Sequence, residues 1–249
     1  MSNPHQYIAL MTSLPHLGNL FARKEVPISD YRLRQRLSML ETDHEALLKE
    51  IIAVTTWAGV SSLEEDLDVI TRALKVIDKL QDYPDLQHLV SGRMETRTII
   101  AALRKRRDGQ EAAGDIRSWG FGRWCSMIKS NWSDPGFGLS HFMPWIAEAH
   151  RLMQSGDHIS MERLALRQVF EQLDHYDRTH KFDFEAVCVY VQRWVVVERW
   201  TRYNTVDART RLETLVAAAL QGPNSDESAN QSPPGIFSET TSSLEGAPS

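Results

Sequence analysis

Apolar side chains recur at helical spacing over residues 62–81, which is the clearest pattern in the chain. They follow one another at intervals of four and three residues: Leu63, Leu67, Ile70, Leu74 and Ile77. This spacing places them on one face of an α-helix. Ser61 followed by Glu64 forms a capping box at its start, and Pro84 follows its end. The pattern covers less than three heptads, so it favours a helix in a bundle over a coiled coil.

The same reasoning predicts further helices on both sides of this segment. They span 43–58, 121–131, 139–154, 160–177 and 205–221. Ser160 is the expected cap of one of them, Thr205 begins a separate last helix, and Pro144 is tolerated in the first turns of another. Residues 7–14 fit either a short strand or a helix, and the pattern leaves this open.

The segment 184–200 is apolar on nearly all sides and rich in β-branched residues, which favour strands. It nevertheless has about three times the length of a typical strand. Its polar positions also gather near one side at about 100° per residue, whereas a half-buried strand would alternate. We therefore predict a buried central helix that begins after Asp183.

The last 28 residues, 222–249, differ from the rest of the chain. They contain no Lys or Arg, four acidic residues, and many Ser and Pro. Too few apolar side chains remain to offset the entropy of ordering the segment, so we expect a disordered acidic tail. The preceding residues, 1–221, are predicted to form an all-α, bundle-like array of helices, with two sub-bundles that meet near 109–120.

Charge and composition narrow the class of protein. The net charge is −5, but the tail carries −4 of it, so the body is close to neutral and nucleic acid is not an expected partner. The two cysteines, Cys125 and Cys188, are too few for a disulfide framework and too far apart for a metal knuckle. No apolar run reaches the length of a membrane span, and no signal peptide is evident. A cytoplasmic location is the expectation.

Motifs for catalysis are absent from the sequence. There is no glycine-rich phosphate loop, no pair of histidines four residues apart with a zinc-protease glutamate, and no nucleophile elbow around a serine. His44 is expected to be exposed in the first turn of a helix. His175, Asp177 and His180 are ligand types that a loop could bring together at a metal ion. The prediction is nevertheless a protein without catalytic residues, cofactor or metal.

Two groups of side chains are candidates for binding a partner. Arg93, Arg97, Arg104 and Arg107 fall within a stripe about 80° wide on a helix. The stripe fits a solvated helix face, a docking surface for an acidic partner, or a buried network that links helices. Trp194 and Trp200 have the spacing of core residues, or of an apolar surface for another helix.

Several segments taken together resemble known proteins. Residues 7–15 combine an aromatic residue, apolar residues and Leu-Pro, and they resemble the start of a bacterial family encoded beside V-type ATPase genes. Residues 97–105 resemble the arginine-containing helix of the socket-like central-stalk subunit of V/A-type rotary ATPases. Phe182–Val187, followed by Arg193-Trp194, Val197–Trp200 and Arg211-Leu212, looks similar to the C-terminal helices of the same family.

This resemblance implies a non-catalytic helical subunit of a V/A-type rotary ATPase, which couples the central shaft to the membrane rotor ring during ion translocation. Its partners would be those subunits, with no nucleic acid and no small-molecule substrate. It would lie on the cytoplasmic face of the inner membrane through the complex. The 221-residue body is shorter than the typical socket-like subunit, which has three helical modules. The alternatives are a free-standing helical adaptor or regulatory interaction protein, and a small metal-dependent enzyme.

Overall fold

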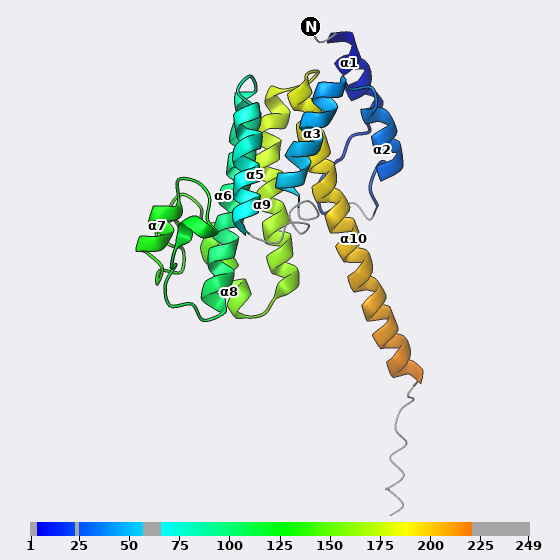
Figure 1. The fold of residues 1–249 in the computed structure, drawn as a ribbon. Coiled ribbons are helices and arrows are strands. Elements are labelled where there is room, and N and C mark those ends of the chain that lie inside the picture. The colour runs from blue at the N-terminus through cyan, green and yellow to red at the C-terminus, as the bar shows by residue number, and fades with distance from the viewer. Residues whose placement is uncertain (1–3, 23–24, 57–65, 221–249) are drawn as a thin grey trace, which may run out of the picture. The chain divides into compact units, whose positions relative to one another are not determined.

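Helices and the turns between them make up the part of the chain that the structure describes (Figure 1). The computed structural model describes residues 4–22, 25–56 and 66–220, with side chains up to Tyr203. The elements are α1 (Pro4–Ser13), α2 (Asp30–Leu37), α3 (Thr42–Thr55), α5 (Asp66–Lys79), α6 (Pro84–Arg107), η1 (Ile116–Ser118), α7 (Cys125–Ser130), α8 (Trp145–Gln154), α9 (His158–Thr179) and α10 (Phe184–Leu220). The predicted all-α fold is confirmed for these residues, and the predicted tail lies outside them.

Helix α6 is the centre of the array, because it packs against α3, α5, α7, α8 and α9. Its 24 residues extend over about 36 Å. The helix begins with Pro84 in its first turn, where the missing N–H has no helical partner to lose. Asp85 in the first turn and four basic residues in the last turn complement the helix dipole.

Buried side chains along α6 belong to three apolar clusters, and Leu89 joins the one formed with side chains of α9 and α10. Val90 and Met94 pack with side chains of α3, α5 and the start of α10. Ile99 and Leu103 pack with side chains of η1, α7 and α8. Full burial of one such side chain stabilises the fold by about 1.5–3 kcal/mol, so both halves of α6 are held in place. The predicted division into two sub-bundles stays a prediction.

Helix α10 confirms the helical interpretation of 184–200. Its N-terminus is capped by Asp183, whose Oδ1 accepts a hydrogen bond from the N–H of Ala186 at 2.7 Å. Side chains on different sides of this helix enter three different apolar clusters, which explains why the segment is apolar nearly all round. The helix continues to Leu220, so the separate helix predicted from Thr205 is wrong. Neither Gly nor Pro is present to end it between 200 and 205.

Other predicted boundaries need correction. Residues 7–13 are helical, within α1, and Leu14 follows the end of that helix. The cap of α9 is Asp157, whose Oδ1 accepts the N–H of Ser160 at 2.9 Å, so Ser160 lies inside the helix. Helix α8 starts at Trp145, directly after Pro144, because 139–144 forms turns. The helices expected over 43–58 and 121–131 are present as the shorter α3 and α7.

Helix α5 buries a different face from the one predicted. Its buried side chains are Val69, Ala73 and Val76, while Leu67 and Leu74 are 49% and 53% exposed. The buried stripe is rotated by about 110° from the predicted one at 100° per residue. Both stripes have the same spacing, so periodicity alone could not choose between them. The predicted capping box lies outside the described residues.

The chain divides into two compact units, 1–206 and 207–249. The apolar clusters described above all lie in the first unit. The described part of the second unit is the last stretch of α10. Among the described residues, no helix is both long enough and apolar enough to cross a membrane.

Candidate functional site

A groove of about 450 Å³ lies along the second half of α6 and is bounded by α9 and by the ends of α3 and α5. Three of the four arginines of the predicted stripe line it, namely Arg93, Arg97 and Arg104. Arg107 does not line it and pairs instead with the adjacent Asp108, with Nη2 2.8 Å from Oδ1. We call this feature the α6 groove.

The three arginines lie at different depths. Arg93 is only 9% exposed and donates from Nη2 to the backbone carbonyl of Thr55 at 2.8 Å. Burial lowers the pKa of Arg93 to about 10, so it remains charged at neutral pH. Arg97 is half-buried, and its Nη2 lies 2.9 Å from Oδ1 of Asp66. Arg104 is exposed, and the described residues provide no ion-pair partner for it.

Apolar and charged groups are both present in the α6 groove. Ile100 of α6 with Met161 and Ala165 of α9 contribute apolar surface. Lys105 also lines the groove, and its Nζ lies 5.1 Å from the ring centroid of Trp119. Glu162 contributes a carboxylate that binds Nε of Arg199 at 2.5 Å. Basic, apolar and two acidic side chains therefore line the same groove.

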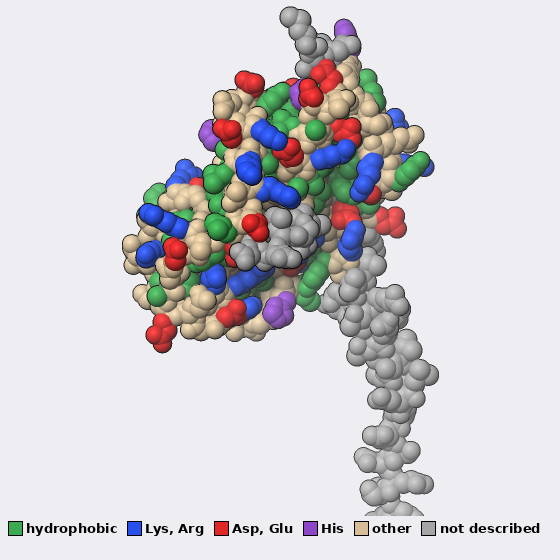
Figure 2. All heavy atoms as spheres, in the orientation of Figure 1, with side chains coloured by type: hydrophobic (Ala, Val, Ile, Leu, Met, Phe, Trp, Pro, Cys, Tyr) green, Lys and Arg blue, Asp and Glu red, His purple; other side chains and the backbone are tan. Residues whose placement is uncertain are grey.

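A second hollow, of about 570 Å³, lies between α3 and α5. Four basic and two acidic side chains line it, and Lys79 Nζ is bound by Glu50 at 2.7 Å. Ala53 and Val76 are its apolar side chains. Figure 2 shows the same mixture of basic and acidic side chains over the face that it draws. The α6 groove is the better candidate because three arginines of one helix face line it together with apolar side chains of α6 and α9.

Trp194 and Trp200, the other candidates for partner binding, are core residues. They are 6% and 7% exposed. Trp194 donates from Nε1 to the backbone carbonyl of Ile28 at 2.9 Å, and Trp200 packs edge-on against Phe21 with ring centroids 5.0 Å apart. Neither ring offers a surface for another helix. Of the two roles left open for these tryptophans, that of core residues is confirmed and that of partner binding is wrong. The cause is the loop before α2, whose Ile28 covers Trp194.

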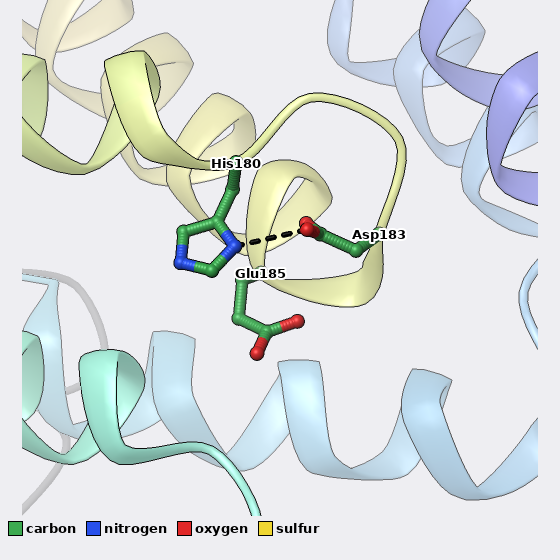
Figure 3. Close-up of side chains that lie close together, drawn as sticks. All are labelled: His180, Asp183 and Glu185. Carbon is green, nitrogen blue, oxygen red and sulfur yellow. Dashed lines mark hydrogen bonds and ion pairs between the residues drawn. The ribbon is translucent and has the colours of Figure 1, made fainter.

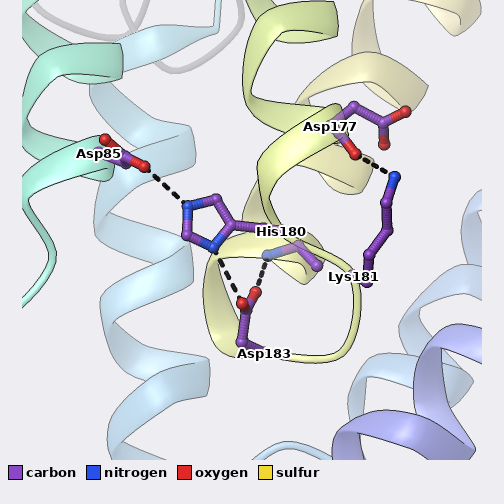
Figure 4. A network of polar contacts seen from close by, with 6 residues as sticks. Asp85, Asp177, His180, Lys181 and Asp183 are labelled. Atoms are coloured by element: carbon purple, nitrogen blue, oxygen red, sulfur yellow. Dashed lines mark hydrogen bonds and ion pairs between the residues drawn. The ribbon is translucent and has the colours of Figure 1, made fainter.

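A second polar site joins the first turn of α6 to the turn between α9 and α10. His180 Nδ1 lies 2.9 Å from Oδ2 of Asp183, and Nε2 lies 2.9 Å from Oδ2 of Asp85. Glu185 approaches the same imidazole from the first turn of α10 (Figure 3). Figure 4 shows how the ring bridges the two aspartates. We call His180, Asp183 and Glu185, with Asp85 behind the ring, the His180 cluster.

Burial and charge act in opposite directions on His180. Burial works against protonation, but the hydrogen bonds to Asp85 and Asp183 outweigh it and raise the pKa of the imidazole above its ordinary value. Burial raises the pKa of the Glu185 carboxyl, and the nearby charge of Asp183 adds to this. The cluster therefore concentrates negative charge around one imidazole.

His175, Asp177 and His180, which a loop could have brought together at a metal ion, are not assembled into one group. Asp177 forms an ion pair with Nη1 of Arg193, and the ring of His175 packs against Tyr176. Of these candidates only His180 enters a group of ligand types. Asp85 was missed in the sequence because it is 95 residues away from His180. Asp183 and Glu185 could have been found, because both follow His180 within five residues.

His44 is half-buried, not exposed as predicted. Its Nε2 lies 2.8 Å from the hydroxyl of Tyr83, and its Nδ1 contacts the hydroxyl of Tyr7. The ring stacks on Phe184 with centroids 4.3 Å apart. Burial raises the pKa of Tyr7 to about 12, so its hydroxyl stays protonated at neutral pH. This bridge ties α1 and α3 to the start of α10.

No family model, curated protein or solved structure matches this chain. The fold and the site by themselves define an all-α protein with a cationic groove on its central helix. The chemistry of that groove therefore decides what kind of ligand it can bind.

Proposed function

We propose that this chain is a non-catalytic helical protein that binds an acidic segment of a partner protein in the α6 groove. The observation that carries the proposal is that Arg93, Arg97 and Arg104 line one groove together with apolar side chains of α6 and α9. A carboxylate of the partner pairs with Arg104 at the open edge. An apolar side chain of the same segment packs beside Ile100. The burial of this apolar surface supplies most of the affinity.

The acidic groups beside the groove favour a protein segment over a polyanion. Asp66 and Glu162 line the groove together with the arginines. Each would repel a phosphate backbone, and the chain carries a net charge of −5. A segment with one or two carboxylates meets less of this repulsion, because it places fewer negative charges near Asp66 and Glu162. Nucleic acid and small-molecule substrates are therefore not part of the proposal.

We further propose that the partner belongs to a V/A-type rotary ATPase, in which the chain couples the central shaft to the membrane rotor ring. The support is the resemblance of three parts of the sequence to proteins of that machine. One of these parts, 97–105, lies on the groove itself, since Arg97, Ile100 and Arg104 all line it. In this role the chain lies on the cytoplasmic face of the inner membrane and contacts the membrane only through its partner subunits.

The test is affinity purification of the tagged full-length chain from the cells that express it, followed by mass spectrometry. We expect the shaft and rotor-ring subunits at near-stoichiometric amounts. Arg104→Glu removes an attraction and adds a repulsion at an exposed site, each about 0.5–1 kcal/mol. The retained amount should therefore fall by roughly 5- to 30-fold.

Arg107→Glu is the matched control, because this substitution makes the same change of charge on the same helix but outside the groove. We expect it to retain the partner subunits at the wild-type level. If the two variants behave alike, the groove assignment is wrong. If the wild-type chain retains no ATPase subunit, the rotary-ATPase proposal is wrong. If it instead retains a different acidic protein, and Arg104→Glu no longer retains that protein, the chain is a free-standing adaptor.

A further inference from the structure

We propose that the His180 cluster is a binding site for a divalent cation of the Zn²⁺ class. The site has three donor atoms that lie within 4.8 Å of one another, one from each of His180, Asp183 and Glu185. The cluster is formed by the first turns of α6 and α10 and by the turn after α9. It shares no residue with the α6 groove, so the inference goes beyond the proposed function.

Asp183 presents one oxygen to the site in a fixed direction. Its Oδ1 is occupied by the N–H of Ala186 at the start of α10, at 2.7 Å. Its Oδ2 therefore points at Nδ1 of His180, at 2.9 Å. Two ligands of a tetrahedral zinc ion lie about 3.3 Å apart, since Zn–N and Zn–O bonds are about 2.0–2.2 Å long. Ion binding replaces the hydrogen bond between Nδ1 and Oδ2, so the Asp183 carboxylate swings off the line of the Nδ1 lone pair to admit the ion.

Asp85 supplies the second feature of a zinc-binding histidine. A metal-bound imidazole almost always donates its other N–H to a carboxylate or carbonyl, which fixes the tautomer and orients the ring. Nε2 of His180 lies 2.9 Å from Oδ2 of Asp85, on the side of the ring away from Asp183 (Figure 4). With Nε2 protonated, Nδ1 offers its lone pair to the ion. Asp85 comes from a separate helix, so it is a positioning residue built into the fold.

The charge around the imidazole favours a cation. Three carboxylates surround one imidazole, and no Lys or Arg forms an ion pair with any of them among the described residues. The half-buried carboxylate of Glu185 lies beside the ring in Figure 3. A bound divalent ion neutralises this excess of negative charge. Water can complete the coordination, as it does where zinc has three protein ligands.

The donor types select among cations. One imidazole nitrogen with two carboxylate oxygens suits Zn²⁺, whereas Mg²⁺ and Ca²⁺ prefer sites composed of oxygen alone. We therefore expect Zn²⁺ to bind in the presence of a large excess of Mg²⁺. Co²⁺, which takes similar geometry, provides a spectroscopic probe of the site.

The experiment is equilibrium dialysis of the full-length chain against ZnCl₂ in the presence of excess MgCl₂. We expect one Zn²⁺ per chain, and visible absorption bands of four- or five-coordinate Co²⁺ when Co²⁺ replaces it. His180→Ala should lose both. His175→Ala is the matched control, because His175 is an exposed histidine five residues away and outside the cluster. It should bind like the wild type.

Two further variants keep the test decisive if His180→Ala fails to fold. Glu185→Gln changes a residue that forms no ion pair among the described residues, and it should lower the affinity at least tenfold with an unchanged circular dichroism spectrum. Asp85→Asn should weaken binding by roughly 10- to 100-fold and shift the Co²⁺ bands, since it alters ring orientation without removing a ligand. Absence of stoichiometric Zn²⁺ in the wild type, or binding that survives both Glu185→Gln and His180→Ala, overturns the proposal.

Discussion

Arg106 is expected to be the most important charged residue for stability between α6 and the turns before α8. Its Nη1 donates to the carbonyl of Trp132 at 3.0 Å and to that of Asp134, and its Nη2 donates to the carbonyl of Pro135 at 2.8 Å. Its guanidinium also lies 4.3 Å from the ring centroid of Phe137. One side chain therefore holds a whole turn. The test is Arg106→Ala.

The magnitude follows from the number of contacts and from their exposure. A hydrogen bond from a charged donor contributes about 1.5–3 kcal/mol when it is buried. Arg106 is half-buried, so water replaces part of this, and the contact with Phe137 adds about 0.5–1 kcal/mol. Phe137 is buried with a positive φ of 55°, a conformation that persists only when its surroundings enforce it. We expect a loss of about 3 kcal/mol in the free energy of unfolding.

The assay is urea denaturation followed by tryptophan fluorescence and circular dichroism. Arg106→Lys keeps the charge, but a single ammonium group cannot reach three carbonyls, so about half of the loss should remain. Arg107→Ala removes an exposed arginine paired only with its neighbour Asp108, and it should cost less than about 0.5 kcal/mol. A loss for Arg106→Ala no larger than for Arg107→Ala would refute the reasoning.

Two further predictions concern the pH dependence of stability and the buried tryptophan. His150 accepts a hydrogen bond at Nδ1 from Arg106 at 3.0 Å, and burial, followed by the charge of Arg106, lowers its pKa. Its contribution to stability is complete above the unfolded pKa of about 6.5 and is lost as the pH falls toward the lowered folded value. The difference in unfolding free energy between wild type and His150→Gln should shrink over that interval, and a constant difference contradicts the assignment. Trp194→Phe leaves the buried carbonyl of Ile28 without its hydrogen-bond donor. The free energy of unfolding, measured by urea denaturation, should fall by about 2–3 kcal/mol, while partner binding is retained. Weaker partner binding in the folded variant would contradict the placement of Trp194 in the core.

Part of the fold follows from local pattern, because α5, α8 and α9 are amphipathic. The errors occur where two interpretations have the same local signal. In α5 two apolar stripes of equal spacing compete, and only packing against α3 and α6 selects the one with Ala73. In α10 the pattern predicted a separate helix from Thr205, whereas a helix without Gly or Pro continues.

The candidate sites were predictable to different degrees for a physical reason. The arginine stripe lies on one helix, so spacing alone placed its members on one face. Spacing could not show that Arg93 is buried against Thr55 while Arg104 is exposed, because depth depends on neighbouring helices. Nothing in its spacing singles out Arg106, which holds a turn that is distant in sequence. Asp85 meets His180 across 95 residues, a separation over which periodicity carries no information.

The two proposed sites can be tested independently, because charge effects between them are weak. Asp85 and Arg97 are twelve residues apart on α6, which corresponds to about 18 Å along the helix axis. This exceeds the Debye length of about 8 Å at physiological ionic strength, so exposed charges at that separation are largely screened. Coupling between the sites would therefore have to pass through packing, along Val90 and Met94 of the same helix. Arg104→Glu and Glu185→Gln thus serve as controls for each other, since each changes one site and leaves the side chains that support the other in place.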